Sequence, residues 1–288
     1  MYRKFPAGNP SGDLPRTPLK MSRELSYPKT TTNKVNRYNQ RASYDALTIH
    51  RIVNATSVLH VSFVVPSDPK DPSSAPLPMI LPMIGQMGSF DYPSSDETDA
   101  LDCYLHGYVS SRIINLARGV EGIPLCVAAT KVDGFVLSLT PNSHSYNYRS
   151  AILHGTATLV IDPAEKLYAM ELITNSVIPD RWNHTRIPPD EAEMSSTSIL
   201  KLKISSASAK VRIGPPMDEK KDSERPGLRE KVWTGVVPVF EALGVPIPSL
   251  DNAVNEVPEY VGVYVEKRNK AEKMHADLVG STVGKKGS

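Results

Sequence analysis

Two adjacent hydroxyls and an arginine, Ser110, Ser111 and Arg112, lie between a predicted strand and a predicted helix. Backbone N–H groups at such a junction favour an anion, and the guanidinium can bind two oxygens of one phosphate. Gly107, just upstream, frees the backbone at the turn. The segment therefore indicates a phosphate-binding loop. The same residues also fit a plain N-cap, in which a serine hydroxyl only satisfies the first turn of the helix.

A second polar cluster begins a later strand and contains His144, Tyr148, Arg149 and Ser150. Arg149 could pair with a phosphate, and Tyr148 and Ser150 could hydrogen-bond the edge of an aromatic heterocycle. His144 is the best candidate for a catalytic histidine, although a role in stabilising the loop fits equally well. The alternative for the whole cluster is a loop that satisfies its own backbone, with Arg149 in a surface ion pair.

The composition excludes several classes of function. The 288 residues are 40% hydrophobic, and 33 Lys and Arg stand against 31 Asp and Glu, so no strong field would recruit nucleic acid or a membrane. Cys103 and Cys126 lie in apolar runs, which predicts free thiols in a reducing, cytoplasmic compartment. No apolar run is long enough to span a bilayer, and the seven histidines show no metal-ligand spacing.

The elements that must position these residues are mainly strands. The hydrophobic pattern predicts strands at 58–65, 79–84, 124–130, 133–139, 148–161 and 198–204, another leading into the loop at 110, and a polar loop at 86–98. Helices are expected at 44–53 with Ser43 as the cap, at 111–118, and after Asp162, where Pro163 favours the first helical position. Pro82 inside a strand predicts an edge or a bulge. Many strands with few short helices indicate a mainly β (β plus α) fold, a β-barrel with peripheral helices.

The chain is expected to have three parts. Residues 1–40 lack a periodic apolar pattern and predict a flexible N-terminal arm. Residues 41–214 carry the barrel, and 215–288 form a C-terminal extension with a helix-like segment at 259–276 and a disordered extreme end. This extension should pack on the barrel, because Trp233 and Phe240 would otherwise be exposed.

The two polar clusters and the order of the elements resemble the pyridoxamine 5'-phosphate oxidase-like, FMN-binding split-barrel superfamily, in particular its flavin-nucleotide-binding branch, which includes the nitroimidazole-resistance proteins. The resemblance spans roughly residues 40 to 215. It is carried by His60–Phe63, Pro82–Met83, Tyr104–Arg112, Lys131–Gly134, Asn147–Ser150 with Gly155, Arg181–Trp182 and Ser208–Gly214.

The resemblance implies an FMN site built from both clusters. Ser110, Ser111 and Arg112 would bind the flavin phosphate, with His106 and Gly107 close by. The resemblance further implies that Arg149 lies beside the phosphate or ribityl group, with Ser150 and Tyr148 near the ring. It places Pro82 and Met83 along the isoalloxazine. Asp133 with Gly134 would form a supporting hairpin, and Trp182 would either close the site or anchor the core.

The resemblance also implies a homodimer with FMN at the interface. The leading hypothesis is an FMN-dependent oxidoreductase that acts on a small molecule, with no metal, nucleic-acid or membrane partner. A non-catalytic carrier of flavin or haem, or a flavin-free barrel with non-redox activity, are the alternatives. The sequence identifies neither the substrate nor the electron donor.

Overall fold

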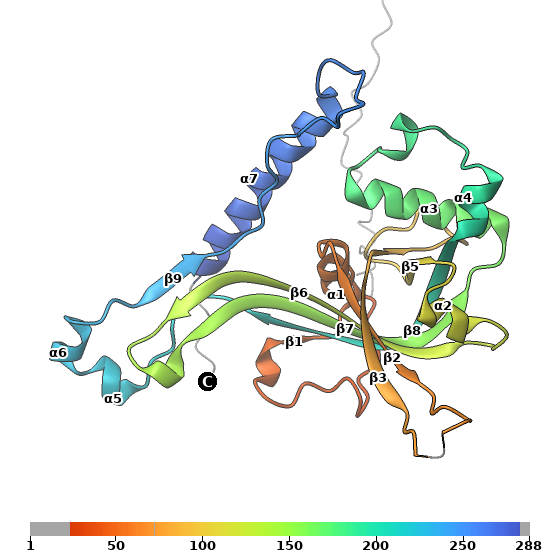
Figure 1. Cartoon of the computed structure of the whole chain (residues 1–288). Helices are drawn as coiled ribbons and strands as arrows, with labels where there is room; N and C mark the ends of the chain where they lie inside the picture. Colours follow the sequence, from red (N-terminus) through yellow and green to blue (C-terminus); the bar gives the residue numbers. More distant parts are fainter. Residues whose placement is uncertain (1–23, 72, 283–288) are drawn as a thin grey trace, which may run out of the picture.

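The computed structural model describes residues 24–71 and 73–282, and its centre is one strongly curved antiparallel sheet (Figure 1). The main strand order is β3-β2-β6-β7-β8-β5-β4, with β1 paired to β8 and β9 paired to β6. The strands are β1 Ala42–Ser43, β2 Leu59–Val65, β3 Leu77–Met83, β4 Gly85–Gly88, β5 Asp102–Tyr108, β6 Ile123–Leu137, β7 Ser145–Leu159, β8 Thr197–Arg212 and β9 Gly235–Pro238.

Helices cover the ends of this sheet (Figure 1). The helices are α1 Ala46–Asn54, α2 Arg112–Ala117, α3 Pro163–Val177, α4 Glu191–Ser196, α5 Lys220–Ser223, α6 Pro226–Arg229 and α7 Glu259–Ser281, with 3-10 turns η1 Asn39–Arg41, η2 Pro141–Ser143 and η3 Trp182–His184. Within the described residues, no helix is both long and apolar enough to cross a membrane.

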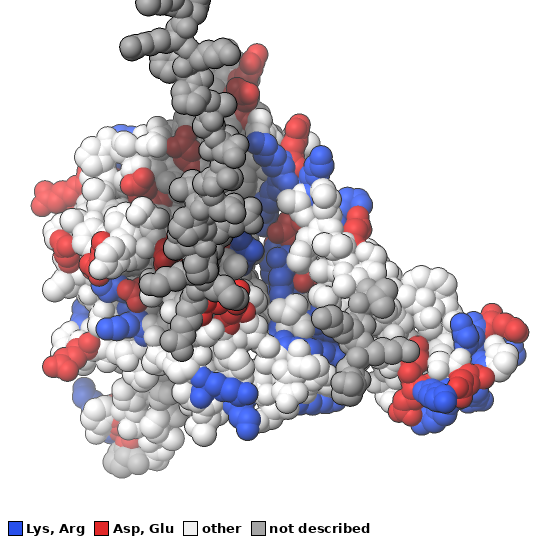
Figure 2. All heavy atoms as spheres, turned by 180° about the vertical axis from the view of Figure 1, so that it is seen from behind, with Lys and Arg blue, Asp and Glu red and all other residues white. Residues whose placement is uncertain are grey.

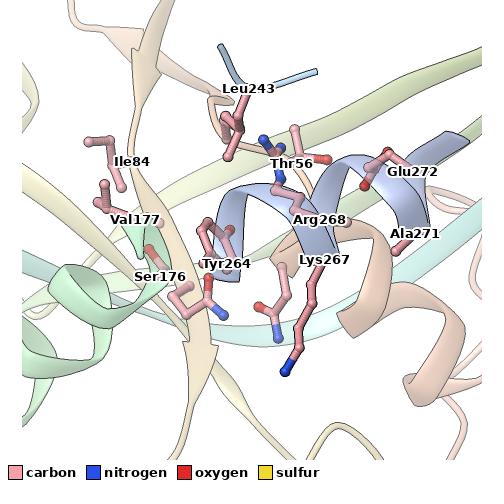
Figure 3. A pocket seen from close by; sticks show the side chains of 15 residues that line it. Thr56, Ile84, Ser176, Val177, Leu243, Tyr264, Lys267, Arg268, Ala271 and Glu272 are labelled. Carbon is pink, nitrogen blue, oxygen red and sulfur yellow. The ribbon is translucent and has the colours of Figure 1, made fainter. Parts of the chain in front are cut away.

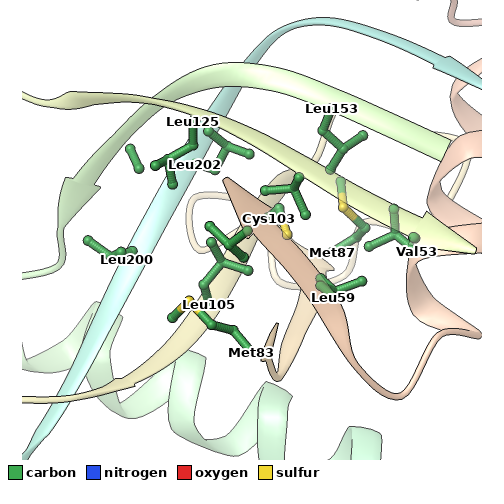
Figure 4. Close-up of a cluster of buried hydrophobic side chains, with 14 of the residues drawn as sticks. Val53, Leu59, Met83, Met87, Cys103, Leu105, Leu125, Leu153, Leu200 and Leu202 are labelled. Carbon is green, nitrogen blue, oxygen red and sulfur yellow. The ribbon is translucent and has the colours of Figure 1, made fainter. Parts of the chain in front are cut away.

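The core lies inside the curve of the sheet, where apolar side chains from β2, β5, β6, β7 and β8 meet (Figure 4). Leu59, Leu105, Leu153 and Leu202 are fully buried there. Each such side chain contributes about 1.5–3 kcal/mol through its removal from water. Alternation of inward and outward residues along each strand supplies this core, as the sequence pattern predicted.

The strand that differs most from the sequence prediction is β6. The strands expected at 124–130 and 133–139 are one continuous strand, with a bulge between Val132 and Gly134. The prediction that Asp133 and Gly134 form a hairpin is therefore wrong, because a polar Asp-Gly pair suits a bulge as well as a turn. The connection to β7 lies at 138–144 and contains η2.

Three smaller predictions can be compared with the structure, which confirms the first and contradicts the other two. β3 pairs only with β2, so Pro82 lies on an edge strand as expected. β4 falls where a polar loop was expected from residue 86, because four residues with two glycines carry too little apolar signal. The cap of α1 is Asp45, which accepts from the Thr48 N–H, and not Ser43, whose hydroxyl bonds Asp45 instead.

α3 begins as predicted, with Asp162 accepting from the Ala164 N–H and proline at the first helical position. It is attached to the sheet by Glu165, whose carboxylate accepts from the Tyr104 hydroxyl at 2.8 Å and from Lys201 Nζ at 2.7 Å. This buried cluster fixes α3 over β5 and β8.

Both predicted extensions differ in part from their expectations. Residues 1–23 of the N-terminal arm lie outside the described residues, but Asn33 further along donates to the Ala207 carbonyl at 2.8 Å, so the latter part of the arm packs on the sheet. In the C-terminal extension, Ala276 and Val279 of α7 are buried, whereas Trp233 remains 66% exposed. The extension therefore packs on the barrel as expected, but through α7 and β9 and not through Trp233. Residues 283–288 also lie outside the description.

Positive and negative side chains are mixed over the surface shown in Figure 2. This mixture agrees with the near balance of 33 basic and 31 acidic residues. Any binding of an anion must therefore depend on local arrangements of charge.

Candidate functional site

The loop between β5 and α2 is fixed at both ends. Gly107 lies against α2, and a Cβ there would come 3.1 Å from the side chain of Ile114, which would have to shift by a few tenths of an ångström. Ile113 and Ile114 anchor α2 in the core. Arg118, which follows α2, donates to the Val109 carbonyl at 2.6 Å, and this hydrogen bond links the two ends of the segment that contains the loop and α2. The polar residues of the loop are therefore held in place before any ligand arrives.

The hydroxyl of Ser111 has an unusual environment. Ser111 occupies the N-cap position of α2, yet its side chain makes no capping hydrogen bond. Its Oγ is buried and has no hydrogen-bond partner among the described residues. Arg112 is exposed and forms no ion pair with a described residue, and Ser110 is exposed beside it. The plain N-cap interpretation of this segment therefore does not describe the Ser111 side chain.

His106 lies on β5 just upstream of this loop and lines a cavity of about 270 Å³. The cavity is apolar on most sides, with Ile84, Ile173 and Val177 in its wall. The His106 side chain is solvent-exposed on one side, and partial desolvation beside the cavity lowers the pKa of its imidazole. A neutral imidazole can donate one hydrogen bond or bind a metal.

The second predicted cluster lies on β6 and β7, away from this loop. Arg149 contacts Asp133 at 3.2 Å and Glu272 of α7 at 3.3 Å, so its charge is already paired within the chain. Ser150 donates to the Lys210 carbonyl at 3.2 Å. Tyr148 stands opposite Arg212 in the register with β8.

The remaining predicted residues are dispersed. His144 follows η2 at the end of the β6–β7 hairpin, where Nδ1 lies 2.9 Å from the Thr140 carbonyl. Pro82 is exposed on β3, and Met83 is buried in the core. Trp182 is buried, and its backbone N–H donates to Asn175 at 2.8 Å. In Figure 1 the hairpin end and α2 lie at opposite ends of the sheet.

The structure also contains a cavity of about 660 Å³ between α7 and the barrel, which the sequence did not indicate (Figure 3). α7 contributes Tyr264, Lys267, Arg268 and Ala271 to it. These residues follow the i, i+3, i+4, i+7 spacing of one helical face. That spacing was the sequence signal for this cavity. Without knowledge that the barrel lies beneath the helix, the same spacing indicates a polar, solvent-facing helix surface.

Residues 45–211 match the family model described as pyridoxamine 5'-phosphate oxidase. This match covers more than half of the chain, and the protein belongs to that family. The curved sheet with peripheral helices is the split β-barrel that the sequence resemblance implied. No curated protein matches the chain.

Two solved structures are similar over most of the chain. The flavocytochrome Anf3 from Azotobacter vinelandii is 26% identical with a TM-score of 0.67, and the match covers 83% of this chain and 99% of that one. The FAD and heme binding protein from Mycobacterium smegmatis is 24% identical with a TM-score of 0.62, covering 78% of this chain and 97% of that one. The similarity to the second protein shows a shared fold.

Proposed function

We propose that this protein is a flavoprotein that binds FMN at the β5–α2 loop and acts as an oxidoreductase on a small molecule. The observation that carries the proposal is the buried Ser111 hydroxyl without a partner among the described residues. A buried polar group left unpaired costs about 1–3 kcal/mol, and a phosphate oxygen would accept its hydrogen bond. Membership of the family and the likeness to a flavocytochrome support a flavin cofactor.

In this proposal the chain positions the cofactor and the flavin supplies the electron-transfer chemistry. Ser110, Ser111 and Arg112 bind the phosphate through hydroxyls and a guanidinium. Gly107 keeps α2 close to the strand, and His106 borders the adjacent cavity.

A homodimer with the cofactor at its interface follows as part of the proposal. The β6–β7 hairpin, in which Asp133, Tyr148, Arg149 and Ser150 lie, ends far from α2 in one chain (Figure 1). A second copy would let its hairpin and its exposed Pro82 approach the flavin, whereas Met83 and Trp182 are buried within their own chain. The two free cysteines support a reducing, cytoplasmic setting.

Titration of the full chain with FMN and with riboflavin tests the phosphate assignment. We expect FMN to bind with yellow colour and to be preferred over riboflavin. Ser111→Ala and Arg112→Ala should each weaken FMN binding about tenfold or more while leaving riboflavin binding nearly unchanged. Arg229→Ala, in the exposed α6, is the matched control. Equal losses for both flavins, or no flavin binding at all, would contradict the proposal.

A second candidate is haem binding, and His106 is the observation that favours it. Its imidazole lines a mostly apolar cavity that is open to an incoming group, and partial desolvation lowers its pKa, which favours the neutral form that an axial ligand requires. Both similar structures carry a haem-related name. Addition of haem to the full chain would then produce a Soret band that His106→Ala shifts or removes. Loss of FMN binding in Arg112→Ala with the Soret band intact would separate the two cofactors.

A further inference from the structure

α7 contacts the rest of the molecule near both of its ends and bridges a cavity between them. Near its start, the ring of Tyr260 stacks on His184 at 4.0 Å between centroids and its hydroxyl accepts from Arg181 at 2.7 Å. Near its end, Ala276 and Val279 are buried. The cavity of about 660 Å³ lies under the middle of the helix and is within the usual size range of small-molecule sites.

The helical face over this cavity is polar. A helix that only packs on a barrel presents an apolar stripe to it, but here Tyr264, Lys267 and Arg268 take those positions beside Ala271 (Figure 3). On the opposite wall, Ile84 and Val177 are apolar. The cavity therefore has cationic side chains on α7 and a mixed wall on the barrel side, where Thr56, Gln86 and Ser176 lie beside the two apolar residues.

The positive charge on this face of α7 is only partly balanced. Glu272 also borders the cavity, but its carboxylate is shared by Lys131 at 3.1 Å and Arg149 at 3.3 Å. The Arg268 side chain is 18% exposed, and the contact of its Nη2 with Glu241 is long, at 3.5 Å. Lys267 forms no ion pair with any residue in the described part of the chain. An anion beside Lys267 and Arg268 would neutralise their remaining positive charge.

This cavity adjoins the smaller cavity that contains His106. Ile84 and Val177 line both this cavity and the smaller one that contains His106. A molecule with its anionic group at α7 could therefore place an apolar body along these two side chains and reach toward His106.

We propose that the cavity under α7 binds the substrate, and that the substrate is an organic anion, a carboxylate or phosphate ester with an apolar body. Its anionic group lies at Lys267 and Arg268, and its body lies against Ile84 and Val177. The assignment of this anion as a substrate rests on the proposed flavin function, whereas the existence of an anion-binding site rests on the cavity alone.

Calorimetric titration of the FMN-saturated full chain with benzoate, phenyl phosphate and uncharged benzyl alcohol tests this inference. We expect saturable binding of at least one of the two anions in the millimolar range or tighter, and none for benzyl alcohol. Lys267→Met combined with Arg268→Met should weaken binding of the anion about tenfold or more. The control pair, Lys270→Met with Lys273→Met, changes exposed lysines of the same helix and should leave binding unchanged.

A second variant keeps the charges and fills the space. Ala271→Leu should also weaken binding of the anion, and thermal unfolding would establish that each variant remains folded. Absence of binding of both anions, or binding that is insensitive to Lys267 and Arg268, would overturn the inference. So would an equal loss of FMN affinity in the Lys267 and Arg268 variant, because the cavity would then belong to the cofactor. If the chain binds no flavin, the same titrations on flavin-free protein would still identify the anion site.

Discussion

Arg149 of β7 and Glu272 of α7 are 123 residues apart in the sequence, and Nη2 of the arginine lies 3.3 Å from Oε2 of the glutamate. The same carboxylate oxygen contacts Nζ of Lys131, whose side chain is only 5% exposed. One carboxylate thus serves two largely buried cations. This contact fastens the C-terminal helix to the barrel.

Glu272→Gln should therefore destabilise the protein more than an ordinary surface change. Removal of one partner from a buried ion pair costs up to about 3–5 kcal/mol when the remaining charge is left unpaired. Here Arg149 keeps Asp133 and Lys131 keeps Glu241, so we expect a loss of about 2 kcal/mol. Urea unfolding and hydrogen exchange in α7 would measure this loss. Asp277→Asn, which breaks an exposed pair with Lys273 on the same helix, should cost about 1 kcal/mol or less. Equal effects of the two variants would show that the buried contact does not hold the helix.

His50 should make stability depend on pH. It is fully buried, with Nε2 2.6 Å from the Tyr27 hydroxyl and Nδ1 2.9 Å from the Glu97 carbonyl. The carbonyl can only accept, so Nδ1 carries the proton and Nε2 accepts from Tyr27. Burial lowers the pKa of His50 below its ordinary value. The unfolded chain therefore binds this proton more readily than the folded one.

The stabilising contribution of neutral His50 is complete above its ordinary pKa of about 6.5 and is lost as the pH falls through the lower folded value. We expect the free energy of unfolding to decrease with acidification in this range. In His50→Leu the decrease should be smaller, although the variant is less stable throughout. Urea curves at a series of pH values would compare the two slopes. Parallel curves would assign the pH dependence to other groups.

Gly155 should tolerate no side chain. A Cβ there would lie 2.1 Å from the Lys203 carbonyl oxygen, at the bulge between β7 and β8. Gly155→Ala should destabilise the protein by about 3 kcal/mol or more, because backbone must move. Gly262→Ala in α7 meets open space and should stabilise by about 1 kcal/mol or less. Thermal unfolding of both variants checks the contrast, which a small effect at Gly155 would refute.

The two thiols should differ in reactivity. Burial raises the pKa of Cys103 to about 12 and also raises the pKa of the less buried Cys126. Because the thiolate is the reactive form, iodoacetamide at mildly alkaline pH should label Cys126 slowly and Cys103 only after unfolding. Peptide mass spectrometry of native and urea-treated protein would follow both sites. Equal native rates would mean that the core opens to the reagent.

The sequence predicted the elements whose signals are local. The capping acid and proline at Asp162 and Pro163 located α3, and Pro82 located the edge strand. β4 and the continuity of β6 were missed, because a two-glycine strand and an Asp-Gly bulge have no distinct local pattern. In each failure, tertiary pairing decided the local conformation.

In the candidate site, too, the residues whose arrangement is local could be predicted, and those brought together by the fold could not. Ser110, Ser111 and Arg112 are contiguous, so their shared loop could be predicted. The cavity under α7 depends on where a distant helix lies, as does the pairing of Arg149 with Glu272. A sequence shows which residues of α7 share a face, but it does not show what that face covers.

The position of β8 in the sheet also constrains when the chain can fold during its synthesis. β8 pairs with β1, β5 and β7, and the register of Ala42 with Lys210 joins residues at opposite ends of the barrel sequence. The pairing with β5 needs residues 197–202 to have left the ribosome, and the pairing with β1 needs residues up to 210. Until then the earlier strands expose unpaired edges, so the nascent barrel is expected to fold late and to need protection from aggregation.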